Sequence, residues 1–136
     1  MISVFDMSVD TARERLLRDL FSGFIRIHIL FHCGQRPFFG GELREELEEH
    51  GYSVSWGTLY PLLHSLCAAG CLAREDRVVG GRVRKYYSLT PEGEETLKAA
   101  REKARELAGE VMEGLENPGR PRRTTRSRIW KRSPGN

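Results

Sequence analysis

The sequence lacks any continuous apolar stretch of about 18 residues, the length that a membrane-spanning helix needs. Its densest apolar segment, residues 24–33, is interrupted by Arg26, His28 and His32. No basic segment leads into an apolar core near the N-terminus, as a signal peptide would require. Cysteine is scarce: there are three, an odd number, and none forms a Cys-x-x-Cys pair, so we expect no disulfide framework. These absences predict a cytoplasmic protein that has no membrane partner.

A catalytic constellation is also missing. Serine, histidine and aspartate are scattered along the chain, and no glycine-rich phosphate loop precedes an expected helix. We therefore expect neither an enzyme nor a bound cofactor. The 136 residues, 39% of them hydrophobic, fit one small domain with extensions and a modest core that a partner chain completes.

Acidic residues are absent from positions 117–136. The arginines and lysines of this segment give it a charge of +7; the whole chain carries +3, which leaves −4 for residues 1–116. We expect a basic tail over 117–136 that is disordered when free. It either holds DNA regardless of sequence or only increases solubility. Because the rest of the chain is not basic, its cations must be concentrated locally if it binds nucleic acid.

Helical periodicity is the main feature that the chain does contain. After a loose arm over residues 1–9, a helix capped by Asp10 or Thr11 is expected to run to about Cys33. Its apolar face is too wide to be covered by its own chain alone, so a second chain is expected against it. The positions of this helix that we expect at such an interface are Leu16 and Leu20.

The next segments lead to the most informative part of the sequence. Residues 34–39 are expected to be a connector, and Glu42–His50 a short acidic helix. From Ser55, leucines recur at spacings of three, one and three, which marks one face of a helix. The Ser55 hydroxyl is placed to cap this helix, and Gly70 ends it.

Two β-rich runs follow this helix, with Gly80-Gly81 between them as the turn and basic residues on and just after it. A helix with a small polar N-terminus beside a cationic hairpin is the outline of a winged helix-turn-helix, a fold that is mainly α with a two-stranded β wing. In that fold the helix end enters a DNA groove and the hairpin lies against phosphates. The candidate DNA-binding residues are Ser55, Thr58, Tyr60, His64, Arg82, Arg84 and Lys85. The alternative is that the hydroxyls of Ser55 and Thr58 only cap the helix, and that the basic residues only form a solvent-exposed face of the hairpin.

Thr90-Pro91-Glu92 is a strong helix start, because it combines a capping hydroxyl, proline at the first position and an early acid. The helix is expected to reach about Glu116, with one apolar stripe close to a heptad seam. We expect this stripe to pair with a second copy of the chain. Its members are Leu97, Ala100, Ala104, Leu107 and Val111. The expected division is therefore a DNA-binding domain over 10–89 and a dimerisation helix over 90–116.

Histidine and cysteine occur twice at spacings that suit a metal. His28 and His32 share a helix face with Cys33 adjacent, and His64 lies three positions before Cys67. Neither group offers four ligands by itself, and cysteine is commonly a small buried hydrophobe. We therefore expect no metal site, and a metal- or thiol-sensing variant stays an alternative.

Two linked motifs give the sequence a family resemblance. SxGTLYPLLxxLxxxGxL begins at Ser55, and GRxRKYYxLTPxG begins at Gly81. Together they resemble the PadR family of bacterial winged-helix regulators, in its short-tailed branch. The resemblance implies a homodimeric transcription factor, usually a repressor, that binds a palindromic operator and is released by small molecules or other signals. It also implies that the C-terminal helix contacts the first helix of the partner.

One departure concerns the effector. Some members of the family hold flat aromatic ligands against tryptophans in the dimer interface, but here the tryptophans are Trp56 and Trp130, and the C-terminal helix has no aromatic residue. A stacked-ligand pocket of that type is therefore not expected, although an effector at the dimer interface remains compatible with the sequence. A second hypothesis is a winged helix that binds another protein, which the charge of −4 on residues 1–116 would suit.

Overall fold

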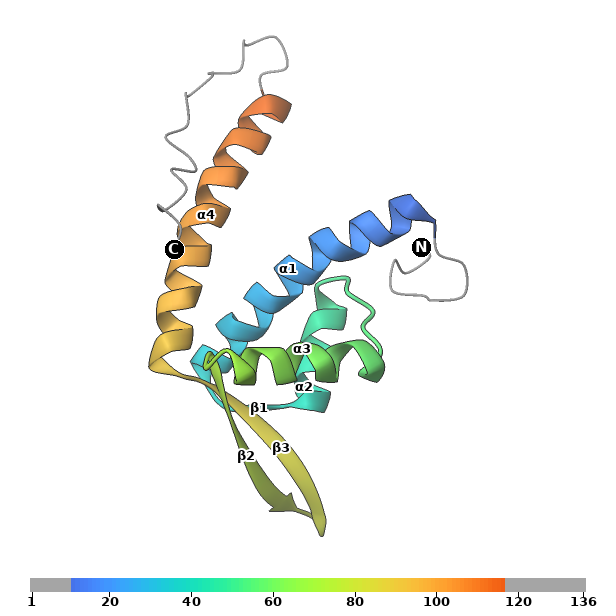
Figure 1. Cartoon of the computed structure of the whole chain (residues 1–136), viewed down its shortest axis with the longest axis vertical. Helices are drawn as coiled ribbons and strands as arrows, with labels where there is room; N and C mark the ends of the chain where they lie inside the picture. The colour runs from blue at the N-terminus through green and yellow to red at the C-terminus, as the bar shows by residue number, and fades with distance from the viewer. Residues whose placement is uncertain (1–10, 117–136) are drawn as a thin grey trace, which may run out of the picture. The chain divides into compact units, whose positions relative to one another are not determined.

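The computed structural model describes residues 11–116, which form four helices and three strands (Figure 1). In chain order these are α1 (Ala12–Gln35), β1 (Phe38–Phe39), α2 (Gly40–Glu49), α3 (Trp56–Ala68), β2 (Leu72–Val79), β3 (Arg82–Leu89) and α4 (Pro91–Glu116). The predicted arm over residues 1–9 and the predicted tail over 117–136 lie outside the described residues. Within 11–116, no helix is long and apolar enough to cross a membrane.

The core is built from matched pairs of residues on the first three helices. α1 contributes Ile25 and Ile29, α2 contributes Leu43 and Leu47, and α3 contributes Leu59 and Leu63, all fully buried. Each pair is four residues apart, so both members point from the same side of their helix. This arrangement holds α3 against α1 and α2 by one face and leaves its opposite face free for a partner.

The sheet has one strand more than the sequence predicted. β1 pairs with β3, and β3 pairs with β2, all antiparallel, in the order β1-β3-β2. The predicted connector over residues 34–39 therefore includes a strand, in which Phe38 lies opposite Tyr87 and Phe39 opposite Tyr86. The prediction of a mainly α fold with a hairpin wing is confirmed, and β1 anchors that wing to the start of α2.

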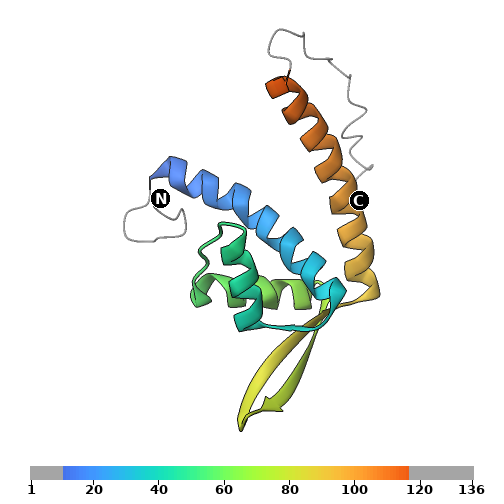
Figure 2. The same ribbon diagram turned by 180° about the vertical axis from the view of Figure 1, so that it is seen from behind.

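The hairpin of β2 and β3 extends away from the three helices in both views (Figures 1 and 2). Gly80 and Gly81 form its two-residue turn, with φ of 59° and 78°. Two consecutive positive φ angles are typical of the tight turns that match the twist of a hairpin, and glycine adopts them without strain. The predicted turn is therefore confirmed.

The acidic helix begins two residues earlier than predicted. We expected Glu42–His50, but α2 spans Gly40–Glu49. The Glu42 carboxylate accepts a hydrogen bond from the backbone N–H of Phe39 at 3.3 Å and one from Arg36 at 2.7 Å. These bonds stabilise a helix start at Gly40 in spite of the poor helix propensity of glycine.

The predicted start of the last helix is confirmed. The Thr90 hydroxyl accepts a hydrogen bond from the backbone N–H of Gly93 at 3.0 Å, and Pro91 is the first helical residue. The chain divides by its internal contacts after Arg101, so residues up to 101 and from 102 onward are two separate units.

Gly93→Ala is expected to lower the free energy of unfolding by about 1–3 kcal/mol. A Cβ atom there would overlap the backbone carbonyl oxygen of Cys71 and the side chain of Leu89, and a carbonyl cannot turn aside as a flexible side chain can. Urea denaturation measures the change. Gly109→Ala is the matched control, since nothing lies within 4 Å of its Cβ position, and it should raise stability by roughly 0.5–1 kcal/mol. Equal effects of both substitutions would contradict this packing.

Candidate nucleic-acid interface

The exposed face of α3 carries three of the side chains that a DNA groove would meet. Trp56, Tyr60 and His64 recur every four residues opposite the buried leucines, and Trp56 and Tyr60 are 40% and 43% exposed. Ser55 precedes the helix as its N-cap, and Thr58 lies in its first turn. The structure thus brings the predicted residues of α3 to one end and one face of the helix.

The Ser55 hydroxyl does not cap the helix in the predicted way. It donates a hydrogen bond to the Thr58 hydroxyl at 3.2 Å, and no side-chain cap bond to the backbone forms. The backbone N–H groups of Thr58 and Leu59 instead donate to the Ser55 carbonyl oxygen, at 3.0 and 2.9 Å. The Ser55 hydroxyl proton is thus already donated within the chain, and the Thr58 hydroxyl is the one whose proton is left for a further acceptor.

A row of aromatic and cationic groups joins α3 to its neighbours. The guanidinium of Arg44, on α2, lies 4.9 Å from the Trp56 ring centre, and Trp56 stacks on Tyr60 with ring centres 5.4 Å apart. The Nζ of Lys85, on β3, lies 5.6 Å from the Tyr60 ring centre. Cation–aromatic contacts of this kind hold side chains in fixed positions at modest gain in free energy. Arg44 and Trp56 were not among the predicted residues, since they are brought to Tyr60 only by the fold.

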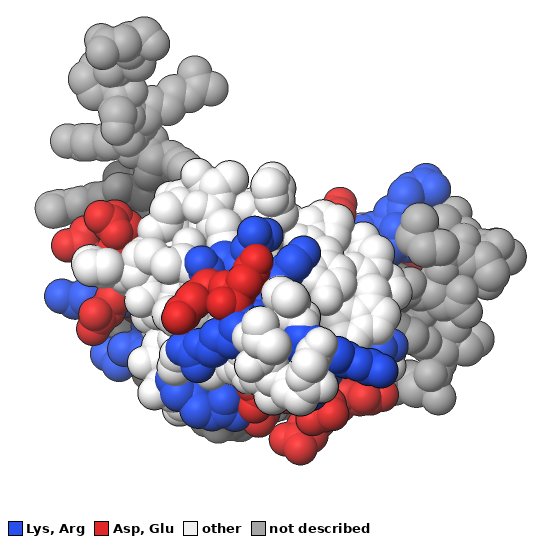
Figure 3. Space-filling view, turned by 90° about the horizontal axis from the view of Figure 1, so that it is seen from below, with Lys and Arg blue, Asp and Glu red and all other residues white. Residues whose placement is uncertain are grey.

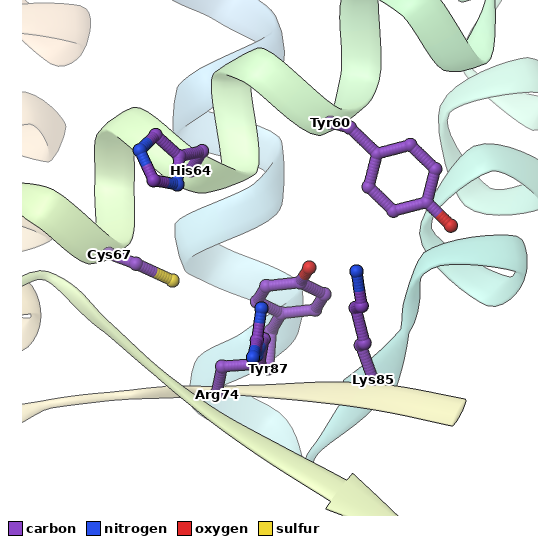
Figure 4. Close-up of a pocket in the computed structure, with 6 residues that line it drawn as sticks. All are labelled: Tyr60, His64, Cys67, Arg74, Lys85 and Tyr87. Carbon is purple, nitrogen blue, oxygen red and sulfur yellow. The ribbon is translucent and has the colours of Figure 1, made fainter. Parts of the chain in front are cut away.

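A hollow of about 390 Å³ lies between α3 and the hairpin (Figure 4). Its lining comprises Tyr60, His64, Cys67, Arg74, Lys85 and Tyr87. The Lys85 amine and the Tyr87 hydroxyl point from the strands toward α3, and the Tyr60 ring extends from the helix toward the strands. Burial raises the pKa of Tyr87, so its hydroxyl stays protonated and can donate a hydrogen bond. With Lys85 as a cation and several hydrogen-bond donors beside it, the hollow can receive an anionic group such as a phosphate.

The cations of the wing fall into two groups. On β2, Arg74 pairs with Asp76 at 3.4 Å and Arg77 pairs with Glu75 at 3.2 Å. On β3, Arg82 and Lys85 form no ion pair with any residue in the range 11–116. In Figure 3, Lys and Arg side chains lie on both sides of the hairpin, with acidic groups among them. The cations on β3 are therefore the ones free to neutralise phosphates.

The three predicted wing cations do not share one surface. Side chains alternate along a strand, so Lys85 faces α3, whereas Arg82 and Arg84 belong to the other face of β3. The Arg84 guanidinium lies 4.5 Å from the ring centre of Phe39, a residue of the neighbouring strand β1. A duplex that contacted all three would have to meet both faces of the hairpin near its tip.

The predicted dimer residues differ in their surroundings. Leu16, Leu20, Ala104, Leu107 and Val111 are exposed, and Ala100 is half-buried. Leu97 is only 7% exposed and packs in the core of its own chain, so its burial needs no partner. The exposed part of the stripe begins beyond the first unit, at Ala104.

The histidines and cysteines are arranged differently from their sequence spacing. His28 and His32 meet His50, which follows α2, and Cys33 is not part of this group. Burial raises the pKa of Cys33 to about 12, so its thiol stays protonated and is a poor metal ligand. His64 and Cys67 line the hollow, whereas Cys71 is buried beside Thr96. The spacing of His28 and His32 indicates two of the three histidines, but only the contact between α1 and α2 shows that His50 belongs with them.

Three helices followed by a β-hairpin, with the third helix exposed beside the hairpin, define a winged helix-turn-helix domain. This class is common among DNA-binding proteins. The comparisons with known proteins agree: the Transcriptional regulator PadR-like family matches residues 29–99. The chain belongs to this family of transcriptional regulators, as its sequence motifs predicted, and regulation rather than catalysis is its class of activity.

Individual relatives support the assignment. Transcriptional regulator Rv3488 of Mycobacterium tuberculosis is 46% identical over 98 residues, which cover 72% of this chain and 92% of the relative. The crystal structure of a PadR family transcriptional regulator from Eggerthella lenta superposes with a TM-score of 0.65 at 31% identity, over 75% of this chain and 90% of the other. For smu.1704 from Streptococcus mutans the TM-score is 0.68 at 27% identity, over 74% and 93%.

Proposed function

We propose that this chain is a sequence-specific DNA-binding regulator that acts as a homodimer on a palindromic operator. The observation that carries the proposal is the exposed face of α3 beside the unpaired cations of β3. In this arrangement α3 lies in the major groove, where side chains contact base edges, and the wing neutralises backbone phosphates. Residues 10–89 form the DNA-binding domain, and 90–116 supply the dimerisation helix.

Each candidate residue has a role in this proposal. Ser55, Thr58 and Tyr60 donate hydrogen bonds to phosphates at the end of α3 that meets the duplex, and His64 reaches a base edge or a phosphate one turn further on. Arg82, Arg84 and Lys85 contact the backbone from the wing. The exposed Leu16 and Leu20 of α1 meet α4 of the second copy, which is the arrangement that the family resemblance implies. Repression, with release by a ligand or signal at the dimer interface, completes the proposal.

Selection of bound sequences from random duplexes tests the function directly. A regulator enriches a sequence with two related half-sites, because two-fold symmetry of the protein is mirrored in its operator. Its affinity for the enriched duplex falls as salt rises, by about 0.9 log units per log unit of salt for each phosphate contact. A protein-interaction module, for which the charge of −4 on residues 1–116 is the supporting observation, enriches no sequence and has no such salt dependence.

Tyr60→Phe is expected to weaken binding to the selected duplex by about 1 kcal/mol, the usual net contribution of one hydrogen bond. The ring is kept, so its stacking on Trp56 and its contact with Lys85 persist, and only the hydroxyl is lost. Fluorescence anisotropy with a labelled duplex measures the change. Tyr86→Phe is the control, because that ring lies against Phe39 on the other side of the sheet. An unchanged dissociation constant for Tyr60→Phe would remove this hydroxyl from the interface.

A further inference from the structure

Three of the four histidines of the chain converge between α1 and α2. His28 and His32 lie four residues apart on one face of α1, and His50 follows the end of α2. One ring nitrogen from each lies within 4.8 Å of the others. His28 and His50 have ring centres only 4.4 Å apart, and His32 lies 6.2 and 5.9 Å from them.

The Nε2 atom of His32 has no hydrogen-bond partner within the described part of the chain, although it is buried. His32 as a whole is 9% exposed, so solvent does not supply a partner readily. A buried polar atom without a partner costs free energy and calls for an explanation, such as an ion that it binds. His32 belongs to the histidine cluster, so the fold holds a buried, unpartnered nitrogen on one of its three rings.

A carboxylate lies beside His32, outside the group whose ligand atoms are all within 4.8 Å of one another. Oε2 of Glu46 lies 3.8 Å from Nε2 of His32, too far for a hydrogen bond. Two ligand atoms on one tetrahedral zinc ion, each about 2.0–2.1 Å from the metal, are separated by roughly 3.3 Å. Glu46 lies on α2, four residues before His50, which caps the end of that helix, and His28 and His32 are four residues apart on α1. Two pairs at helical spacing therefore face each other across the contact of the two helices.

We propose that His28, His32, His50 and Glu46 bind one divalent transition-metal ion of the zinc type, which links α1 to α2. Three imidazoles and one carboxylate are a donor set that suits Zn²⁺ in tetrahedral geometry, and imidazole also suits Ni²⁺ and Cu²⁺. His50 is exposed and His28 half-buried, so an ion can reach the site from solvent. Binding requires the imidazole rings to rotate from their stacked arrangement, and the Glu46 side chain to turn toward them, so that one ligand atom of each residue points to a common centre.

The other ionisable groups that face the cluster are the Glu46 carboxylate and the Tyr52 ring, whose centre lies 5.6 Å from that of His28.

A bound ion would act on the elements that contact DNA, a consequence that rests on the proposed function. α2 carries Arg44, which lies over Trp56 of α3, so fixing the end of α2 against α1 also restrains α3. The metal site itself is tested without DNA, so its failure and that of the proposed function are distinguishable.

The test is calorimetric titration of the full, chelator-treated chain with Zn²⁺, and its visible absorption spectrum with Co²⁺. We expect one ion per chain and the intense absorption of tetrahedral Co²⁺. His50→Gln should weaken Zn²⁺ binding by about 100-fold or more, and Glu46→Gln by roughly 10–100-fold. Because His32 is buried and its replacement can disturb the fold, the exposed His50 carries the test. His64→Gln, which removes the histidine outside the cluster, is the control. It should bind Zn²⁺ as tightly as the unchanged protein does.

Thermal unfolding gives a second measurement. Zn²⁺ binds the folded site and should raise the melting temperature of the unchanged protein and of His64→Gln, but not that of His50→Gln. The proposal is overturned if the unchanged protein binds no Zn²⁺ at one equivalent, or if His50→Gln binds as tightly as the unchanged protein. It is also overturned if His64→Gln loses the binding, because the site would then lie in the hollow beside α3.

Discussion

Leu107→Asp is expected to convert the dimer into monomers and to abolish binding to the operator. Leu107 is 51% exposed on α4, in the stripe that continues through Ala104 and Val111, which are also exposed. In the proposed dimer this side chain is buried against the second copy, so an aspartate would place an unpaired charge in an apolar seam. The penalty is several kcal/mol, about 3–5 where such a charge stays buried. A monomer presents one α3 helix and contacts one half-site, so affinity for the full operator is lost with the dimer.

Sedimentation velocity and circular dichroism separate this outcome from unfolding. The core pairs of α1, α2 and α3 lie in the other unit, so helical content should be largely kept. Gly109→Asp is the control, because two residues correspond to a rotation of about 200°, so the same charge lies on the opposite face of the same helix, and nothing is within 4 Å of its Cβ position. A Leu107→Asp protein that stays dimeric and still binds the operator would show that α4 does not form the dimer seam.

Most of the fold could be predicted from local signals. The leucine spacing after Ser55, the glycine pair of the turn and the Thr90-Pro91 helix start each specify an element within a few residues, and all three are present. β1 could not be predicted in this way, because two residues carry no periodicity. Its existence depends on Phe38 and Phe39 meeting Tyr87 and Tyr86, which are far away in the sequence.

The candidate site was predictable to the extent that it lies on one element. The helical period places Tyr60 and His64 on the face opposite the leucines, and the structure agrees. The contacts between elements were not predictable: Arg44 reaches Trp56 from α2, and Arg74 reaches the hollow from β2. His50 joins the other histidines for the same reason, since the packing of α1 on α2, and not any spacing, brings them together.

Alanine at Arg82, Arg84 and Lys85 together is expected to weaken binding to all duplexes alike, by roughly 100-fold at physiological salt if each cation contacts one phosphate. Phosphate contacts carry no sequence information, so the ratio of operator to random affinity should be preserved. Because about 0.9 counterion is released per contact, the slope of log affinity against log salt should flatten by about 2.7. Anisotropy titrations at several salt concentrations measure both quantities.

The size of this effect depends on how the hairpin meets the duplex. Lys85 faces α3 and Arg84 faces β1, so full loss requires a duplex that contacts both faces of the wing. Arg13→Ala with Lys98→Ala and Arg101→Ala removes the same charge from exposed positions away from the wing, and is the control for general electrostatic attraction. If the two triple variants lose the same affinity, the wing makes no specific phosphate contacts. If only the variant with the wing substitutions loses affinity and its slope flattens by about 0.9 instead, a single cation contacts the backbone. Lys85→Ala alone then identifies whether that cation is the one held over Tyr60.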